Sequence, residues 1–434
     1  MQNFRYSRMA CGLLVLAALA AGDGRVHAQD ARTVTLQEAV RLAVERDPLA
    51  IAAEAAVSNA RADQLVARGA LLPSLNLNTF WANSSNERFD QATGRLVSES
   101  YTAQLQGGWD VFAGGRRFAN LRSTGASLDA ADAQYLSQRY NTILRTTQLF
   151  YAAAAASDLV QVSGQRLERA RQQLAAAQTR LELGTVTRSD VLRAELELGN
   201  AEVALLEVEA DLRRTGLELG RQIGIDELIA AEPAALPDSA PALAPTEQLI
   251  VEATRSSPSV NAAESTRRAR RAERLAAYTP YLPTVRLSGG YDWFAFDWPP
   301  NQRSWSMRVT ASLPVFNNFQ RESALQRAGA AERVAEARER DARAQARVLV
   351  ESGVADIAAA ERRVEIADRA VQLAREDLRV IEERYGLGHA TIIELQTSQV
   401  ALSDAEVAAV RSRQTLGTAI AQLEAVLGRT INEE

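Results

Sequence analysis

The sequence predicts a mainly α-helical protein with a smaller β component, in which long coiled-coil helices are joined to short strands in two tandem copies. Three observations support this fold class. Apolar residues recur every seven positions over long stretches, other segments alternate between apolar and polar residues, and landmarks of the first half return in the second. Only 24% of the 434 residues are charged and 47% are hydrophobic, yet mean hydropathy is −0.19, too polar for a bundle of membrane helices.

The N-terminus has the features of a cleaved export signal over residues 1–28. Arg5 and Arg8 precede the apolar run Gly12–Ala21, and a small-x-small sequence ends at Ala28. The run is too short to span a bilayer, which takes about 20 residues; the alternative is a buried N-terminal helix. Cys11, the only cysteine, lies before the apolar run. We therefore expect an exported, cysteine-free mature chain that carries no lipid anchor.

Two copies of one unit are predicted, because Pro73 and Gly184 in the first half correspond to Pro283 and Gly388 in the second. Repeat 1 is predicted over 29–225, with a helix Leu36–Leu71 interrupted at Pro48, a strand pair at about 72–112 and a long helical hairpin over 115–223. A Pro-rich linker follows over 226–248. Repeat 2 is predicted over 249–434, with a helix, a strand pair at about 282–316 and a long helical hairpin over 320–427.

The strand pairs have a period of two. Apolar and polar residues alternate from Tyr101 to Val111 and from Trp305 to Val315, and the strands that precede them show the same pattern. We expect strands of about 10–13 residues, the length that crosses a bilayer when tilted, joined by polar loops over Ser84–Ser98 and Asp297–Gln302. All five tryptophans are predicted to lie in these strands, as an aromatic girdle would require.

The remaining segments are predicted to be unusually long helices. A helix from Arg116 to Leu183 would be about 100 Å long, and two shorter helices laid end to end would flank it. Seven-residue spacing predicts a coiled-coil seam for each hairpin. The seam positions are Val160, Leu167, Leu174 and Leu181 with Val191, Leu198, Leu205, Leu212 and Leu219, and then Val364, Val371, Leu378 and Tyr385 with Leu395, Leu402, Ala409, Leu416 and Leu423.

Composition excludes several classes of function. The net charge is −5 with no lysine, so no basic excess favours a nucleic-acid partner. His27 and His389 are the only histidines, so nucleophilic triads and histidine-rich metal sites lack their residues. We expect no enzyme activity, no cofactor and no metal site.

Four strands cannot close a membrane barrel, which needs about eight. An open sheet edge in lipid leaves unpaired backbone groups that cost several kcal/mol each, so the strands must close with other copies of the chain. Two, three or four copies would give 8, 12 or 16 strands. A barrel that continues into a rod of coiled coils would form a conduit lined by the polar strand faces.

The whole mature chain resembles the TolC family of outer-membrane efflux and secretion channels. The likeness is sharpest at Arg180-Leu-Glu-Leu-Gly184 with Asp190-Val191, and at Arg384-Tyr-Gly-Leu-Gly388 with Glu394-Leu395, where the family has R-[FY]-x-x-G followed six residues later by an acid. The resemblance implies a homotrimer with a 12-stranded barrel in outer-membrane lipid and a helical tunnel in the periplasm. It also implies docking to a periplasmic adaptor (membrane fusion) protein and an inner-membrane RND or ABC transporter.

The resemblance also implies a gate at the hairpin tips, where Gly184 and Gly388 would form the turns. Asp190 and Glu394 fall on the acidic positions, and three of each near a threefold axis would favour cations. An alternative explanation is local, because Thr187 to Asp190 and Thr391 to Glu394 have capping-box spacing. Both roles can coexist.

The sequence departs from the family at two tip positions. Thr397 stands where some members carry a second acid, and Ala390 where some carry an arginine that bridges the hairpins; Arg188 is a candidate substitute. His389 is expected to be a solvated turn residue, with pH sensing as the alternative. The arginine-rich segment Arg333–Arg347 is interspersed with acids, which predicts a solvated helix face.

Two functions from different classes remain. The first is a passive exit duct for small molecules or polypeptides that an inner-membrane transporter delivers. The second is a periplasmic structural or adaptor coiled coil whose strands form a soluble sandwich. Trp clustering on one face favours the duct, and single-channel conductance would separate the two.

Overall fold

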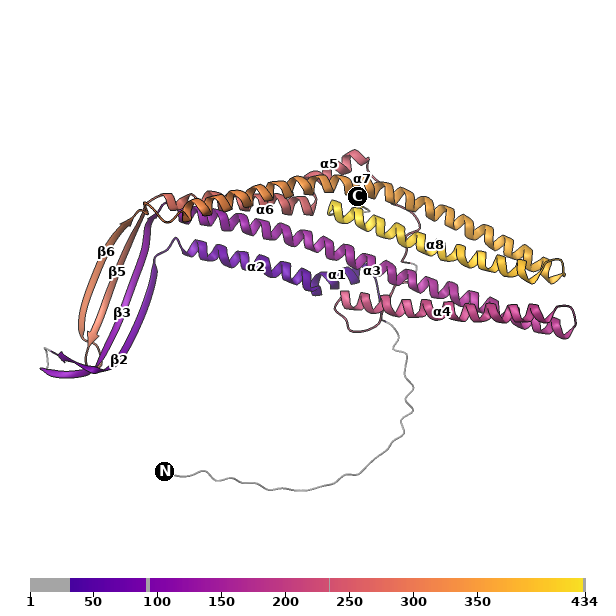
Figure 1. Cartoon of the computed structure of the whole chain (residues 1–434), viewed down its shortest axis with the longest axis horizontal. Coiled ribbons are helices and arrows are strands. Elements are labelled where there is room, and N and C mark those ends of the chain that lie inside the picture. The colour runs from indigo at the N-terminus through magenta and orange to yellow at the C-terminus, as the bar shows by residue number, and fades with distance from the viewer. Residues whose placement is uncertain (1–31, 91–93, 234, 432–434) are drawn as a thin grey trace, which may run out of the picture.

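The computed structural model describes residues 32–90, 94–233 and 235–431. It is an elongated molecule with a β-sheet at one end and helical hairpins at the other (Figure 1). The predicted export signal lies outside the described residues. Among the helices that the structure describes, none combines the length and apolar character needed to cross a bilayer.

The sheet has four antiparallel strands in the order β2-β3-β5-β6. They are β2 (Ser74–Asp90), β3 (Arg95–Ala113), β5 (Thr284–Ala295) and β6 (Gln302–Ser312). The two copies meet where β3 pairs with β5, so β2 and β6 form the edges. One face carries exposed large apolar side chains, and the other carries the polar residues, as the alternation predicted; the apolar set includes Leu75, Leu77, Trp81, Trp305, Met307 and Val309.

The predicted loop Ser84–Ser98 is wrong, because β2 and β3 continue through most of it. Pairing resumes after a register shift between Asn83 and Arg88 and runs to Asp90 opposite Arg95. This part of the ribbon extends beyond β5, whose last pair joins Ala295 to Tyr101. In the described chain no further strand pairs with this extension, so its two faces need not differ in polarity and its sequence shows no period of two.

Trp298 also departs from the prediction. It lies between β5 and β6 rather than in a strand, and its ring meets that of Tyr101 edge-on with the centroids 5.8 Å apart. The other four tryptophans lie in strands, at positions 81, 109, 293 and 305.

The described chain contains eight α-helices and one 3₁₀ turn. They are α1 (Leu36–Arg46), α2 (Pro48–Gly69), α3 (Arg116–Glu182), α4 (Arg188–Gln222), α5 (Thr246–Ser256), α6 (Pro258–Ala276), α7 (Gln320–Gly386) and α8 (Ile392–Leu427), with a 3₁₀ turn η1 (Thr279–Tyr281). The break at Pro48 is fixed by Asp47, whose Oδ1 accepts from the backbone N–H of Leu49 at 3.1 Å. Its Oδ2 accepts from the buried Thr142 hydroxyl at 2.7 Å, which ties the break to α3.

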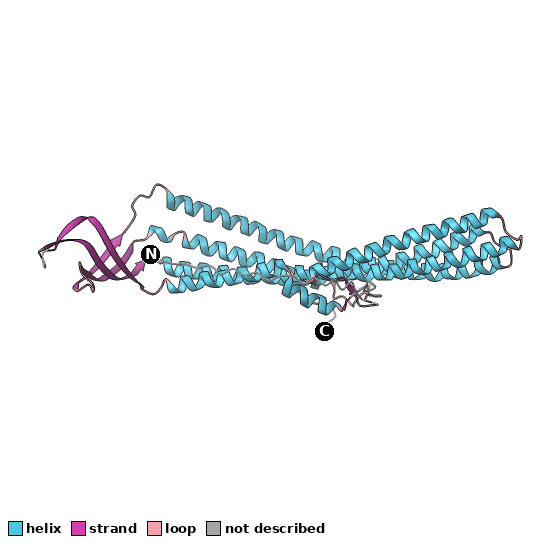
Figure 2. Ribbon diagram, turned by 90° about the horizontal axis from the view of Figure 1, so that it is seen from below, coloured by secondary structure: helices cyan, strands magenta, loops and turns pink. Residues whose placement is uncertain are grey.

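Side by side, the helices make a single strip of four. Between the sheet and the middle the order is α2-α3-α6-α7; from the middle to the tips it is α4-α3-α8-α7 (Figures 1 and 2). Two shorter helices thus flank each 67-residue helix end to end, which confirms the predicted packing. Helix α7 and the strand β6 form one long edge, whereas α2, α4 and β2 form the other.

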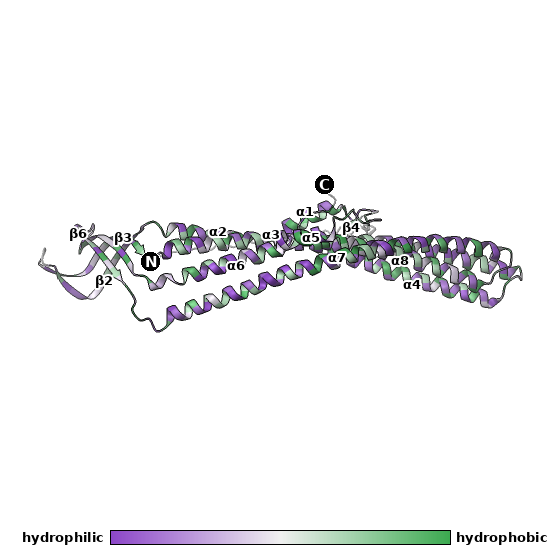
Figure 3. Ribbon diagram, turned by 90° about the horizontal axis from the view of Figure 1, so that it is seen from above, coloured by the Kyte–Doolittle hydropathy of each residue, from purple (hydrophilic) through white to green (hydrophobic). Residues whose placement is uncertain are grey.

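The heptad seam is buried more completely in the second copy. Val371 and Leu378 of α7 pack with Leu395 and Leu402 of α8, and Val364 lies in the neighbouring cluster with Leu416; all five side chains are buried. In the first copy Leu167 is buried, but Leu181 near the tip is 38% exposed. Apolar and polar residues interleave along all the long helices (Figure 3).

Short elements surround the middle of the strip. The strand β1 (Arg32–Val34) pairs in parallel with β4 (Ile229–Ala231), a sheet too short for the sequence pattern to reveal. Here Phe150 of α3 packs with Leu219 and Ile223, while Leu416 of α8 lies in the neighbouring core of the second copy; each of these side chains is at most 1% exposed.

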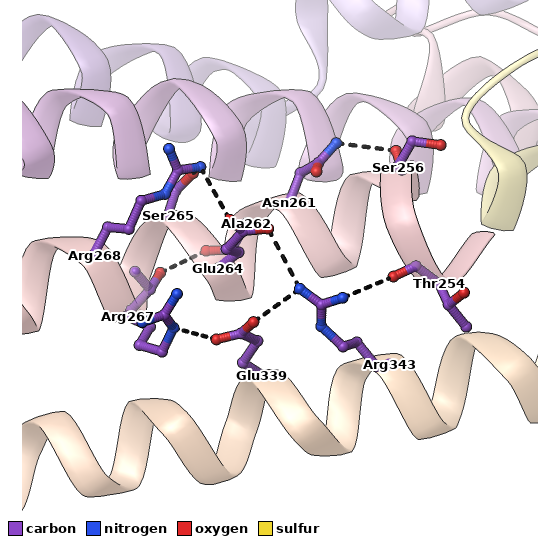
Figure 4. Close-up of polar contacts among 11 residues, drawn as sticks. Thr254, Ser256, Asn261, Ala262, Glu264, Ser265, Arg267, Arg268, Glu339 and Arg343 are labelled. Carbon is purple, nitrogen blue, oxygen red and sulfur yellow. Dashed lines mark hydrogen bonds and ion pairs between the residues drawn. The ribbon is translucent and has the colours of Figure 1, made fainter. Parts of the chain in front are cut away.

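An ionic network holds α5 and α6 on α7 (Figure 4). The Arg343 guanidinium donates to Glu339 at 2.9 Å and to the Thr254 carbonyl at 3.3 Å, and Arg267 pairs with the same Glu339 carboxylate. Burial alone would raise the pKa of Glu339, but the hydrogen bonds from Arg343 and Arg267 outweigh it and lower this pKa. The prediction of a wholly solvated face for Arg333–Arg347 is therefore wrong at Arg343, which also contacts Thr254 and Glu264, 89 and 79 residues away along the chain.

Candidate functional site

Each helical hairpin turns at a glycine in the left-handed region. Gly184 has φ +74° and Gly388 has φ +77°, values at which a side chain is strained. The turn after Gly184 is closed by a bond from Thr185 N–H to the Arg180 carbonyl at 2.9 Å, and the turn after Gly388 by His389 N–H to the Arg384 carbonyl at 2.8 Å. His389 is exposed.

The second helix of each hairpin begins with a complete capping box. At α4 the Thr187 N–H donates to Asp190 Oδ2 at 2.9 Å, and Asp190 N–H donates to Thr187 Oγ1 at 3.4 Å. At α8 the Thr391 N–H donates to Glu394 Oε2 at 2.7 Å, and Glu394 N–H donates to Thr391 Oγ1 at 3.2 Å. The structure thus places both acids in the capping role that their spacing allowed.

The surroundings of Glu394 favour the charged form of its carboxylate. The backbone N–H and the hydroxyl of Thr391 both donate to Glu394, and with the nearby Arg384 they hold the pKa of Glu394 below its usual value. Glu394 is exposed and Asp190 is partly exposed. A carboxylate at a helix N-terminus interacts favourably with the positive end of the helix dipole.

Arg188 does not bridge the hairpins within the described chain. It is exposed at the first residue of α4, and none of the hydrogen bonds or ion pairs among the described residues involves it. No structural observation assigns it a role.

Arg180 makes the contact between hairpins that sequence reasoning missed. Its guanidinium lies 4.4 Å from the centre of the Tyr385 ring, and its Nη1 donates to the Tyr385 carbonyl at 3.3 Å. A second link runs from Gln396 Nε2 on α8 to the Arg193 carbonyl on α4, at 3.2 Å. The signal was present, since Arg180 opens the first tip motif and Tyr385 stands in the second, but the motif alone does not pair them.

A hollow of about 450 Å³ lies between the tips and is lined by Arg180, Asp190 and Tyr385 among others. Among the described residues, no group of histidine, cysteine, aspartate and glutamate side chains could hold a metal ion. The arrangement offers charged and polar groups that can bind and orient a charged molecule.

A strip with an amphipathic sheet at one end and paired coiled coils with acidic tips at the other defines a channel-forming class of outer-membrane protein. The chain matches the sequence model of the outer membrane efflux protein family over residues 39–224 and again over 249–429, and it belongs to that family. The predicted TolC-family resemblance is confirmed, and the chain is an outer-membrane efflux or secretion channel protein rather than an enzyme.

Individual relatives are distant in sequence. Protein CyaE of Bordetella pertussis is 26% identical over 372 residues, covering 84% of this chain and 78% of that protein. The nickel-cobalt-cadmium resistance protein NccC of Alcaligenes xylosoxydans xylosoxydans is 26% identical over 360 residues, covering 80% and 75%. The crystal structure of the outer membrane protein VceC from Vibrio cholerae superposes with a TM-score of 0.74 at 19% identity, covering 92% of this chain and 97% of that one.

Proposed function

We propose that three copies of the chain close into an outer-membrane exit duct with a 12-stranded barrel and a periplasmic helical tunnel. The single observation that carries the proposal is the strip with two unlike edges. Its edge strands β2 and β6 run antiparallel to each other, so β2 of one copy can pair with β6 of the next and satisfy the backbone groups that an open sheet exposes in lipid.

The helical edges support the same closure. On α4, Leu196, Val203 and Leu217 fall on one seven-residue register, and each is at least half exposed. On α7, at the opposite edge, Ile366, Leu373 and Val380 are spaced by seven and exposed as well. Two apolar heptad stripes on opposite edges are complementary in a ring of copies, where each would become a coiled-coil seam.

Closure would bring the tips together around one axis. Three Asp190 and three Glu394 carboxylates would then surround the entrance and favour cations over anions. The contact between Arg180 and Tyr385 would hold the two hairpins of a chain together in the narrow state.

The duct would be passive, with energy and cargo choice supplied by an inner-membrane RND or ABC transporter through a periplasmic adaptor. The cargo would be small molecules or polypeptides. This part of the proposal follows from family membership, and the alternative of a periplasmic adaptor with a soluble β domain predicts a protein that needs no detergent.

The test measures mass and conductance of the purified mature protein. In detergent we expect three times the chain mass, and in planar bilayers single-channel currents. Leu373→Asp should reduce the assembled fraction by placing a charge in the new seam, whereas Glu382→Ala, an exposed position two residues after Val380 and hence on the other side of α7, should not. A protein that stays monomeric, dissolves without detergent and gives no current in planar bilayers would refute the proposal of an exit duct.

The partners need a separate test. Co-expression with the adaptor and transporter of one system should allow the three proteins to be purified together, and substitution of exposed tip residues should abolish this. Purification of all three irrespective of the tip substitutions would contradict docking at the tips.

A further inference from the structure

The polar face of the sheet carries two arginines side by side. Arg286 of β5 pairs with Thr310 of β6, and the next pair on the same face joins Ser288 to Arg308. The two arginines are therefore diagonal cross-strand neighbours that point to one side. Both lie close to the helical end of the sheet, since β5 begins at Thr284 and β6 ends at Ser312.

A hollow floored by glycines lies beside both arginines on this face. It has a volume of about 340 Å³, and Ser74, Gln106, Asp292 and Ser306 line it together with both arginines. A Cβ on Gly108 would stand 3.0 Å from Arg286 Nη2 and 3.5 Å from Ser74 Oγ. The absence of a side chain at Gly108 thus lets the Arg286 guanidinium lie across β3.

Positive charge exceeds negative charge at this place. Asp110 lies 3.6 Å from Arg286 and also 3.6 Å from Arg116, so one carboxylate is shared by two guanidiniums. In the described part of the chain no ion pair involves Arg308, which is exposed. Asp292 is on the same face but is paired in register with Ser304, four residue pairs further from the helices than the pair of Ser288 and Arg308.

We propose that Arg286 and Arg308 form an anion-binding station in the wall of the conduit, which takes carboxylate or phosphate groups of the molecules in transit. The inference rests on the proposed function, because the polar face lines a conduit only in the closed barrel. In a trimer six guanidiniums would ring the barrel near its junction with the tunnel. A guanidinium offers a planar fork of donors that fits carboxylate and phosphate oxygens, and the serine hydroxyls beside it supply further donors.

This station has the opposite sign to the acidic tips at the other end of the molecule. A ring of arginines raises the local concentration of anions and sets a barrier to cations. The barrel and the tunnel entrance would therefore contribute opposite terms to the ion preference of the duct, and the two contributions are separable by mutation.

The test is single-channel recording of the mature protein in planar bilayers under a KCl gradient, with inorganic phosphate as the probe. We expect Arg308→Gln, and more strongly the double variant R286Q/R308Q, to shift the reversal potential toward cation permeation. Inhibition of the current by phosphate should weaken roughly tenfold or more, the loss expected for a charged hydrogen-bond partner. Arg308→Lys should keep the ion preference and lose part of the phosphate affinity, since it retains the charge without the fork.

The matched control is Arg303→Gln. Arg303 lies on the same strand but pairs with Trp293, on the apolar face, so its removal should change neither quantity. If R308Q conducts with the same reversal potential and phosphate inhibition as R303Q, the station is refuted while the channel stands. If the wild-type protein forms no channel at all, the proposed function fails instead.

Discussion

Two substitutions at the second hairpin tip separate helix capping from charge. Thr391→Ala removes the hydroxyl that accepts from Glu394 N–H at 3.2 Å but keeps the carboxylate. Loss of such an N-cap costs about 1 kcal/mol, which increases local opening of the first turn of α8 about fivefold. Glu394→Gln removes the charge, while an amide at this position still accepts from the Thr391 backbone N–H.

The assays are hydrogen–deuterium exchange over the first turn of α8 and ion preference in bilayers. Thr391→Ala should speed exchange there and leave the preference for cations unchanged, whereas Glu394→Gln should do the reverse. Because hydrogen bonds from Thr391 and the positive charge of the nearby Arg384 lower the pKa of Glu394, its charge and its contribution to selectivity should persist to lower pH than for an ordinary glutamate and should be lost as pH falls through the lowered pKa.

The reasoning would be refuted if Glu394→Gln left the cation preference intact, since the acid would then serve only the cap. Faster exchange in E394Q than in T391A would equally show that the charge, and not the capping geometry, stabilises the helix start. Thr187→Ala in the first copy serves as the parallel variant, with the same expected local effect at α4.

Three further predictions concern stability and gating. Glu339→Gln should lower the free energy of unfolding by about 2 kcal/mol at neutral pH, because two guanidiniums lose their charged acceptor. Since the pKa of Glu339 is lowered in the folded protein, the extra stability of the wild type is present above the usual glutamate pKa and should disappear as pH falls through the lowered pKa. Unfolding curves at several pH values would measure this difference. Gly216→Ala should destabilise the middle of the strip by about 1–3 kcal/mol, because the new Cβ would stand 2.6 Å from the Ile229 carbonyl oxygen, and an unchanged unfolding temperature would contradict this. Arg180→Ala should increase single-channel conductance by removing the contact with Tyr385, worth about 0.5–1 kcal/mol at a partly exposed site; equal conductance in variant and wild type would mean that this contact does not restrain the hairpins.

Elements with strong periodicity could be predicted from the sequence. The 67-residue helices follow from seven-residue spacing, and the capping boxes follow from a threonine three residues before an acid, since both patterns are local. The β2–β3 extension up to Asp90 could not be predicted, because pairing there depends on hairpin continuation and not on a buried face.

Contacts between distant segments were also out of reach. Arg180 reaches Tyr385 across 205 positions, and Arg343 reaches the Thr254 carbonyl across 89. A charge pattern along one helix predicts which side chains are polar, but only the packing of the helices side by side decides which of them meet.

Helices α3 and α7 run without a break from the sheet to the tips, and short elements surround only their middle. Each is therefore a rod about 100 Å long that is packed at its middle, around Phe150 and Leu416. A tilt of one degree about this middle moves either end of the helix by about 1 Å. Rotations of only a few degrees about the middle are therefore enough to displace either end of such a helix by several ångströms.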